Sequence, residues 1–330
     1  MLCTVLQDAP EVELFFPDTV FVDSVSEGYV GITQGYGTVD SILWITNGDT
    51  TRTTATNYSC SFHTAGIDSI AVVVFDDDGN AVRISQPAVA ATLVSGEFTG
   101  KFIFNRTLSP FIIRENILFR DSIIVESGTD IVFRGGTAEC MSNIAFNGLV
   151  TDSIHIFNCR FSVKNSSNVN FSAEYCHITG NNRSFLEAYV SFKDFTLRNS
   201  YIDNFSTFAI WLLTGDIDIS YNYFISCGNF SISPQLDNSY RVSHNDFNEN
   251  STSIILELDQ TNAHIDVDNN NFFPPVTYIL TMKEGSSGTC NFTNNYALGI
   301  TDIADLNPYL NIGSGNTISI TGLSAQPITH

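Results

Sequence analysis

The sequence has few basic residues. Lys and Arg number 14 against 35 Asp and Glu, which gives a formal net charge of −21. A surface this negative repels phosphate backbones, so we expect no nucleic-acid partner. The same charge disfavours an unaided grip on a polyanionic polysaccharide, whereas it favours solubility and resistance to self-association.

Long hydrophobic runs are also missing. No stretch reaches the roughly 18 apolar residues of a membrane-spanning helix, so none is expected. Residues 1–10 lack the basic region and the apolar core of a secretion signal. Two explanations stay open: the protein is made without that route, or a signal has been removed. Cys3 could then be the remnant of a lipid-attachment site.

The seven cysteines form no Cys-x-x-Cys pair, which argues against a zinc site. Their dispersed positions fit buried small hydrophobes better than a disulfide scaffold. A P-loop, a Rossmann glycine pattern and a nucleophile elbow are absent too. We therefore expect neither a bound cofactor nor a metal, apart from the calcium considered below.

A repeat of eight-residue segments is present instead. The template reads apolar, x, apolar, x, polar, small polar, x, apolar, and successive copies start 17, 24, 22, 23, 25 and 25 residues apart. The alternation predicts short strands with one apolar face, and a single coil could not bury that face alone. The copies are Ile154–Phe161, Phe171–Ile178, Phe195–Ile202, Ile217–Phe224, Tyr240–Phe247, Ile265–Phe272 and Cys290–Ala297.

Position six of the template supports stacking of these coils. It reads Cys159, Cys176, Ser200, Asn222, Asn245, Asn270 and Asn295. Asn tolerates left-handed backbone at tight turns, and stacked amides can hydrogen-bond along the stack. The pattern resembles the asparagine ladder of pectate-lyase-like right-handed parallel β-helices over roughly residues 100–325. That resemblance implies the fold but not the function, because the fold carries lyases, hydrolases, phage tailspikes and adhesins.

The N-terminal third has a different pattern. Trp44 stands in a strand that runs into a Gly48-Asp49 turn, and an alternating strand from Ile67 ends in Asp-x-x-Gly at Gly79. With Phe62 and Gly66, these residues resemble a PKD-type, immunoglobulin-like sandwich. The family's second turn glycine is replaced by Thr50, and its usual aromatic before the long strand is Ile67. We expect Trp44 to belong to the core.

The predicted fold class is therefore all-β, with a right-handed single-stranded parallel β-helix preceded by a small β-sandwich. The expected domains are an N-terminal arm at residues 1–14, a PKD-like sandwich at 15–95, and a β-helix with a C-terminal cap at 96–330.

Outward positions two and four supply the candidates for chemistry. Position two reads His155, Ser172, Thr196, Asp218, Arg241, Asp266 and Asn291. Because adjacent strands lie about 4.8 Å apart, Asp218, Arg241, Asp266 and Asp268 should form one cluster, and Glu174 should contact Arg198. The cluster suits a carboxylate pair for glycoside hydrolysis or an acid–base set for elimination. It suits equally a solvated ladder in which Arg241 relieves repulsion between aspartates.

The resemblance weighs against catalysis, because lyases of this fold pair their acids with several basic residues or calcium. Asp266 and Asp268 could offer oxygen ligands to calcium, but no aspartate-repeat loop accompanies them. The leading hypothesis is a non-enzymatic structural or recognition protein, extracellular, on a cell surface or on a virion. Its partners would be a surface polysaccharide or other surface proteins, and the likeness to tailspikes implies a homotrimer. The alternative is a secreted polysaccharide lyase or glycoside hydrolase.

Overall fold

The computed structural model describes residues 9–33, 37–46, 48–163, 169–185, 187–188, 192–213, 215–234, 240–248, 254–256, 264–273, 280–282, 289–298, 310–312 and 317–319. Apart from the 3-10 turn η1 (Arg106–Leu108), the regular structure of these residues is β-strand, so the all-β prediction is confirmed. Within the same ranges, no helix is long and apolar enough to cross a membrane. Two compact units are present, Met1–Leu93 with Thr107–Phe111, and Val94–Arg106 with Ile112–His330.

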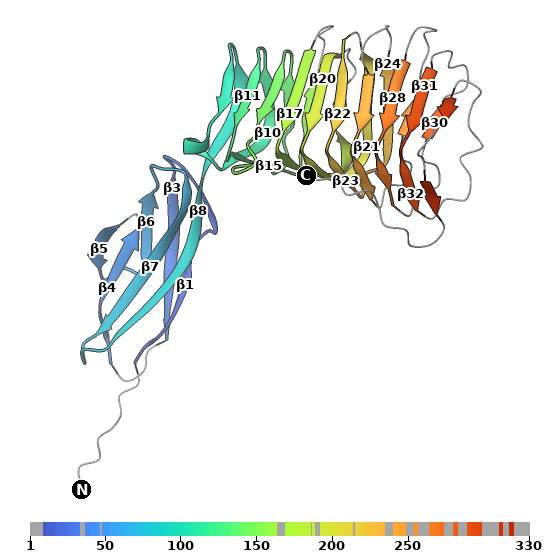
Figure 1. Ribbon diagram of the computed structural model, residues 1–330. Helices are drawn as coiled ribbons and strands as arrows, with labels where there is room; N and C mark the ends of the chain where they lie inside the picture. The colour runs from blue at the N-terminus through green and yellow to red at the C-terminus, as the bar shows by residue number, and fades with distance from the viewer. Residues whose placement is uncertain are drawn as a thin grey trace. The chain divides into compact units, whose positions relative to one another are not determined.

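The first unit is a sandwich of two sheets (Figure 1). The smaller sheet is antiparallel and holds β1 (Glu11–Phe15), β3 (Val25–Thr33) and β6 (Asn57–Ser61). The larger sheet holds β5 (Asp49–Thr53), β4 (Val39–Thr46), β7 (Gly66–Asp76), β8 (Ala81–Phe98) and β2 (Thr19–Phe21). Strand β1 starts inside the expected N-terminal arm, and β8 continues through the expected boundary at residues 95 and 96.

The core of the sandwich contains the residues on which the PKD resemblance depends. Trp44 and Phe62 are fully buried, and the Trp44 ring stacks on Tyr58 with 5.0 Å between centroids. Gly48 and Gly79 have φ angles of 79° and 88°, a region that glycine enters without steric cost. The prediction that Trp44 is a core residue is confirmed.

The second unit is a parallel β-helix of three sheets, which we call A, B and C. Sheet A has ten parallel strands, whose stacking is visible in Figure 1. They are β9 (Phe102–Phe104), β11 (Ile123–Glu126), β14 (Ile144–Asn147), β17 (Val169–Glu174), β20 (Phe192–Arg198), β22 (Ile217–Ser220), β25 (Tyr240–Ser243), β28 (His264–Asp268), β31 (Thr289–Thr293) and β33 (Leu310–Ile312). In β11 and β14, for example, buried side chains alternate with partly or fully exposed ones, as the repeat predicts.

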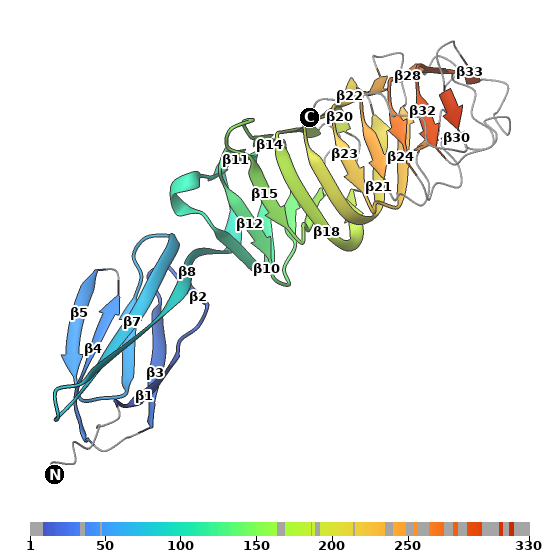
Figure 2. The same ribbon diagram turned by 60° about the horizontal axis from the view of Figure 1, so that its bottom comes forward.

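Sheet B follows sheet A in each coil and is seen in Figure 2. Its strands are β12 (Asp130–Phe133), β15 (Ile154–Phe157), β18 (Cys176–Phe185), β21 (Tyr201–Leu213), β23 (Tyr223–Ile225), β26 (Asp246–Asn248), β29 (Asn271–Phe272), β32 (Tyr296–Leu298) and β34 (Thr317–Ser319).

Sheet C closes each coil. It contains β10 (Phe111–Phe119), β13 (Ala138–Cys140), β16 (Phe161–Val163), β19 (Glu187–Ala188), β24 (Asn229–Pro234), β27 (Ile254–Leu256) and β30 (Leu280–Met282). Strands β18 and β21 are long because each turns the corner from sheet B into sheet C, with shifts of register at or near the corner.

The first copy of the predicted repeat is out of register. The sequence alignment places Ile154 in one column with Phe171, but the partner of Phe171 is Ile144, and Ile154 pairs with Cys176 in sheet B. The 17-residue spacing arises because strands of sheets A and B share the same apolar alternation. His155 therefore belongs to sheet B, and Cys159 donates its amide to the carbonyl of Thr179 (2.8 Å), outside the ladder. The remaining copies pair as predicted.

The asparagine ladder lies at the turn between sheets A and B. Fully buried Asn245 accepts bonds at Oδ1 from the backbone and side-chain nitrogens of Asn222, at 2.9 and 3.0 Å. Its Nδ2 donates to the carbonyl of Ile219 (2.9 Å) and to Asn270 Oδ1 (3.0 Å). The ladder continues to Asn295 on one side. Stacking is thus fixed by amides that satisfy one another away from water.

The sequence analysis predicts that the ladder asparagine is the left-handed residue of this turn. In the structure, the left-handed residue is the one before it. Six successive coils show φ between 49° and 59° at this position: Tyr175, Asn199, Tyr221, His244, Asn269 and Asn294. Asn suits that conformation, whereas bulky Tyr is strained in it. The ladder residue is required for its amide, because the Asn245 side chain accepts from the Asn222 backbone amide and donates to the Ile219 carbonyl in the preceding coil, and it donates to Asn270 Oδ1 in the next.

Candidate functional site

The predicted cluster lies on the outer side of sheet A. Asp218, Arg241 and Asp266 occupy equivalent positions on β22, β25 and β28, and Asp268 follows two residues after Asp266. Together with Glu174 and Arg198 we call this set the charged face. Its register is as predicted, while the catalytic role of its residues stays a prediction.

Ion pairing on the charged face differs in detail from the prediction. Arg198 Nη1 lies 3.8 Å from Glu174 Oε1, as expected, and Arg198 Nε donates to Asp218 Oδ2 at 2.9 Å. Asp218 is therefore paired with Arg198, while the Nε of Arg241 is 3.5 Å from Asp268 Oδ1. Exposed pairs of this kind contribute little to stability.

Asp266 lies in a network of its own on the charged face. Its Oδ1 accepts a bond from Asn291 Nδ2 (2.9 Å) and lies 3.1 Å from His264 Nε2. A pocket of about 490 Å³ opens over Asp218 and Arg241, with Asp194, Thr196, Arg198, Asp216 and Ile217 as its other lining residues. Asp266 and Asp268 are not among the described residues that line it, so this pocket brings together Asp218 and Arg241 but not the other two predicted catalytic residues.

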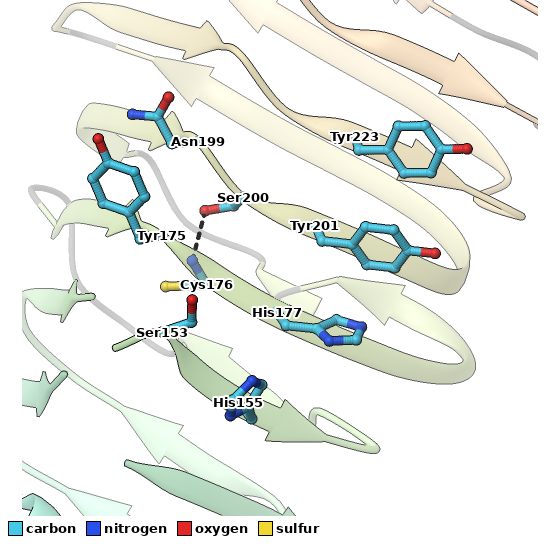
Figure 3. A pocket seen from close by; sticks show the side chains of 9 residues that line it. All are labelled: Ser153, His155, Tyr175, Cys176, His177, Asn199, Ser200, Tyr201 and Tyr223. Atoms are coloured by element: carbon cyan, nitrogen blue, oxygen red, sulfur yellow. Dashed lines mark hydrogen bonds between the residues drawn. The ribbon is translucent and has the colours of Figure 1, made fainter. Parts of the chain in front are cut away.

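A larger pocket of about 640 Å³ lies on the outer side of sheet B, close to the turn from sheet A (Figure 3). Four rings from successive coils form its floor: His155 on β15, His177 on β18, Tyr201 on β21 and Tyr223 on β23. We call these four residues the aromatic face. Ser153, Tyr175, Cys176, Asn199 and Ser200 complete the lining.

The rings form a continuous row because their strands are paired in register. The centroids of His155 and His177 are 6.0 Å apart, those of His177 and Tyr201 are 4.6 Å apart, and those of Tyr201 and Tyr223 are 5.2 Å apart. The strand spacing of about 4.8 Å sets this repeat. In Figure 3 the side chains of His177, Tyr201 and Tyr223 extend in the same direction from their strands.

Carboxylates border the aromatic face. Asp130 precedes His155 in the column, and its Oδ1 lies 2.9 Å from His155 Nδ1. Asp203 Oδ2 lies 3.7 Å from His177 Nε2, a ring atom that is buried without a hydrogen bond. At the other end, Asp246 follows Tyr223 in the column.

The thiol in this pocket is unsuited to nucleophilic chemistry. Burial raises the pKa of Cys176 to about 12, so the nucleophilic thiolate is scarce at neutral pH. The Cys176 amide donates to Ser200 Oγ (3.1 Å), drawn as a dashed line in Figure 3, which makes both residues part of the ladder. Among the described residues, no group of three or more His, Cys, Asp and Glu is arranged to hold a metal ion.

Sequence reasoning missed the aromatic face because it placed His155 in the wrong sheet. A spacing signal was nevertheless present. Asp130, His155, His177, Tyr201, Tyr223 and Asp246 follow one another at 25, 22, 24, 22 and 23 residues, close to the length of a coil. Polar and aromatic residues at that interval stack on the outside of a β-helix just as apolar residues stack inside.

Comparison with solved structures gives matches to PKD domains over the N-terminal part of the chain. The PKD1 domain from Vibrio cholerae metalloprotease PrtV is 23% identical over 26% of this chain and 100% of that chain, with a TM-score of 0.23. The PKD1 domain of Vibrio anguillarum Epp is 18% identical over 26% of this chain and 98% of that chain, also at 0.23. Fibronectin(III)-like modules of Clostridium thermocellum CbhA are 18% identical over 24% of this chain and 96% of that chain, with a TM-score of 0.22.

No protein-family model matches the sequence, and no curated protein matches it either. Strand pairing confirms the predicted architecture, a PKD-like sandwich followed by a parallel β-helix. At these identities and TM-scores, the similarity to solved structures carries no argument about activity.

Proposed function

We propose that this chain is a non-enzymatic recognition protein whose β-helix binds a glycan through the aromatic face. The observation that carries this proposal is the row of His155, His177, Tyr201 and Tyr223 over a pocket of about 640 Å³. Aromatic rings offer apolar area together with polar ring atoms, which matches the alternating C–H and hydroxyl groups of a sugar.

The row runs across four successive coils, and this supports an extended ligand over a small molecule. Each coil adds one ring at about the strand spacing, so a linear chain of sugars could contact several rings in turn. The acidic composition keeps a protein dispersed outside a cell, where such ligands are displayed. We place the protein on a cell surface, in the extracellular medium or on a virion, with the sandwich as a connector.

The test is a glycan-binding screen with matched variants. Tyr201→Ala and Tyr223→Ala should each weaken binding at least tenfold, because each removes a ring from the pocket floor. Tyr29→Ala is the control, since Tyr29 is an exposed ring on the sandwich, 48% accessible and stacked on Phe15. Binding that is unchanged by both pocket variants would contradict the proposal.

A second candidate is supported by the pocket over Asp218 and Arg241, where a carboxylate and a guanidinium face one cavity. The same glycan panel should be assayed for new reducing ends and unsaturated products. An enzyme would lose turnover by about 100-fold or more in Asp218→Asn while keeping its melting temperature. Turnover of any glycan by the parent protein would replace the recognition proposal with the lyase or hydrolase one.

A further inference from the structure

We propose that the aromatic face selects neutral saccharides over carboxylated ones. The inference rests on the proposed glycan binding and names the class of its ligand. It is carried by three carboxylates on the outer side of sheet B: Asp130 and Asp246 stand at the two ends of the column of rings, and Asp203 lies in the next column.

The carboxylates flank the row of rings. Asp130 stands directly before His155, Asp246 stands directly after Tyr223, and Asp203 lies beside His177. No Lys or Arg is among the residues that line the pocket. A sugar carboxylate on this face would meet three like charges within a few coils, in addition to the overall net charge of −21.

A neutral sugar is not repelled by these carboxylates and can form hydrogen bonds with them. Carboxylate oxygens accept hydrogen bonds, and sugar hydroxyls donate them. His155 adds a further acceptor. Its Nδ1 lies 2.9 Å from Asp130 Oδ1, so the proton of the neutral ring belongs on Nδ1 and the lone pair on Nε2. Such a site can accept from a hydroxyl, whereas a carboxylate ligand has no proton to give it.

The experiment measures affinity for two matched probes, a neutral hexagalactoside and hexagalacturonate, by calorimetry at pH 8 in the same salt. We expect the neutral probe to bind at least tenfold tighter. Asp246→Asn removes one of the three carboxylates and should raise the affinity for hexagalacturonate several-fold.

The outcomes separate this inference from the proposed function. Equal binding of both probes, or tighter binding of the uronate, overturns the selectivity and leaves glycan binding standing. If the full glycan screen, which contains other neutral hexoses matched to their uronates, gives no binding to the parent protein, both proposals fall. A neutral hexose other than galactose that binds in place of the first probe becomes the neutral member of the pair, with its own uronate as partner.

Discussion

At the scale of single residues, the ladder amides are the most constrained groups in the β-helix. Replacing Asn245 with Leu removes a side chain that makes four bonds in the interior. Asn222 Nδ2 keeps the Leu197 carbonyl and Asn270 Oδ1 keeps the backbone amide of residue 245, so the loss falls on the Asn222 backbone amide and the Ile219 carbonyl. Since each unsatisfied buried group costs about 1–3 kcal/mol, we expect a loss of about 2–5 kcal/mol in the free energy of unfolding, measured by urea titration.

The control for that variant is Asn147→Leu, which makes the same substitution at an exposed end of β14. It should change stability by no more than about 0.5 kcal/mol. Similar stabilities for the two variants would show that the ladder contributes no more than a surface residue.

The buried cysteines give a second prediction at this scale. Burial raises the pKa of Cys159 to about 12, and that of Cys227 likewise. In the unfolded chain these thiols ionise near their ordinary pKa of about 8.5. Below that pH the folded state keeps its full stability, whereas above it the free energy of unfolding falls by about 1.4 kcal/mol per pH unit for each such thiol. Stability should therefore fall steeply from pH 9 to pH 11.

Cys159→Ala isolates one thiol from the other groups that titrate in alkali. Its unfolding free energy should fall less steeply than that of the parent, by about 1.4 kcal/mol per pH unit above pH 9. Parallel lines for the two proteins, obtained from urea titrations at each pH, would mean that Cys159 is not buried as a neutral thiol.

At the scale of strands, the sequence determines which residues point inward but not always which sheet they belong to. Phe171, Phe195 and Ile217 were aligned correctly because they pair with one another in sheet A, one coil after another. Ile154 was misplaced because the apolar alternation is the same in sheet B, and only pairing partners distinguish the two. The aromatic face was hidden by that one error, whereas the charged face, which starts after it, was placed correctly.

Side-chain partners were harder to predict than register. The sequence puts Arg241 directly beside Asp218, but packing selects Arg198, which lies diagonally across from it on β20, as its ion-pair partner. Such choices depend on rotamers, which periodicity does not contain. Likewise, the left-handed residue at Tyr221 could not be expected from its type, because Tyr is unfavourable there.

Because the coil is the repeating unit, deletion of one whole coil should be tolerated better than deletion of part of a coil. Removing residues 223–245 deletes one coil and joins Asn222 to Asp246, so that Asn222 takes the place of Asn245 beside Asn270. Because each coil contacts mainly its neighbours, the shortened protein should fold cooperatively with reduced stability. Removing only residues 223–234 breaks the register and should abolish cooperative unfolding followed by circular dichroism. Equal behaviour of the two deletions would contradict the coil as the repeating unit.

At the scale of the whole molecule, the chain passes between its two units more than once. Residues Thr107–Phe111 belong to the first unit although Val94–Arg106 belong to the second. Within the first unit, the Thr92 amide donates to the Pro110 carbonyl (2.8 Å) and Thr92 Oγ1 to the Leu108 carbonyl (2.6 Å). A β-helix fragment that starts at residue 94 therefore loses these two bonds.

The end of β8 gives this fragment a cap. Phe98 stacks on Phe119 (5.2 Å between centroids) and packs edge-on against Phe102 (4.5 Å), while its carbonyl accepts the amide of Arg120 (3.0 Å). A solenoid exposes its apolar interior at a terminus unless side chains cover it. Phe98 lies where the first coil begins, so it provides that cover from the second unit itself.

We therefore expect fragment 94–330 to keep a β-type circular dichroism spectrum and to unfold cooperatively, because its cap does not come from the sandwich. Phe98→Ala in the same fragment should cost about 2–4 kcal/mol, since it removes a large ring from the terminal layer of the core. Exposed Phe157, 39% accessible on β15, provides the matched control, and Phe157→Ala should cost about 1 kcal/mol or less. If fragment 94–330 is unfolded at room temperature while the full chain is folded, the sandwich is itself the cap, and the two units form one folding unit.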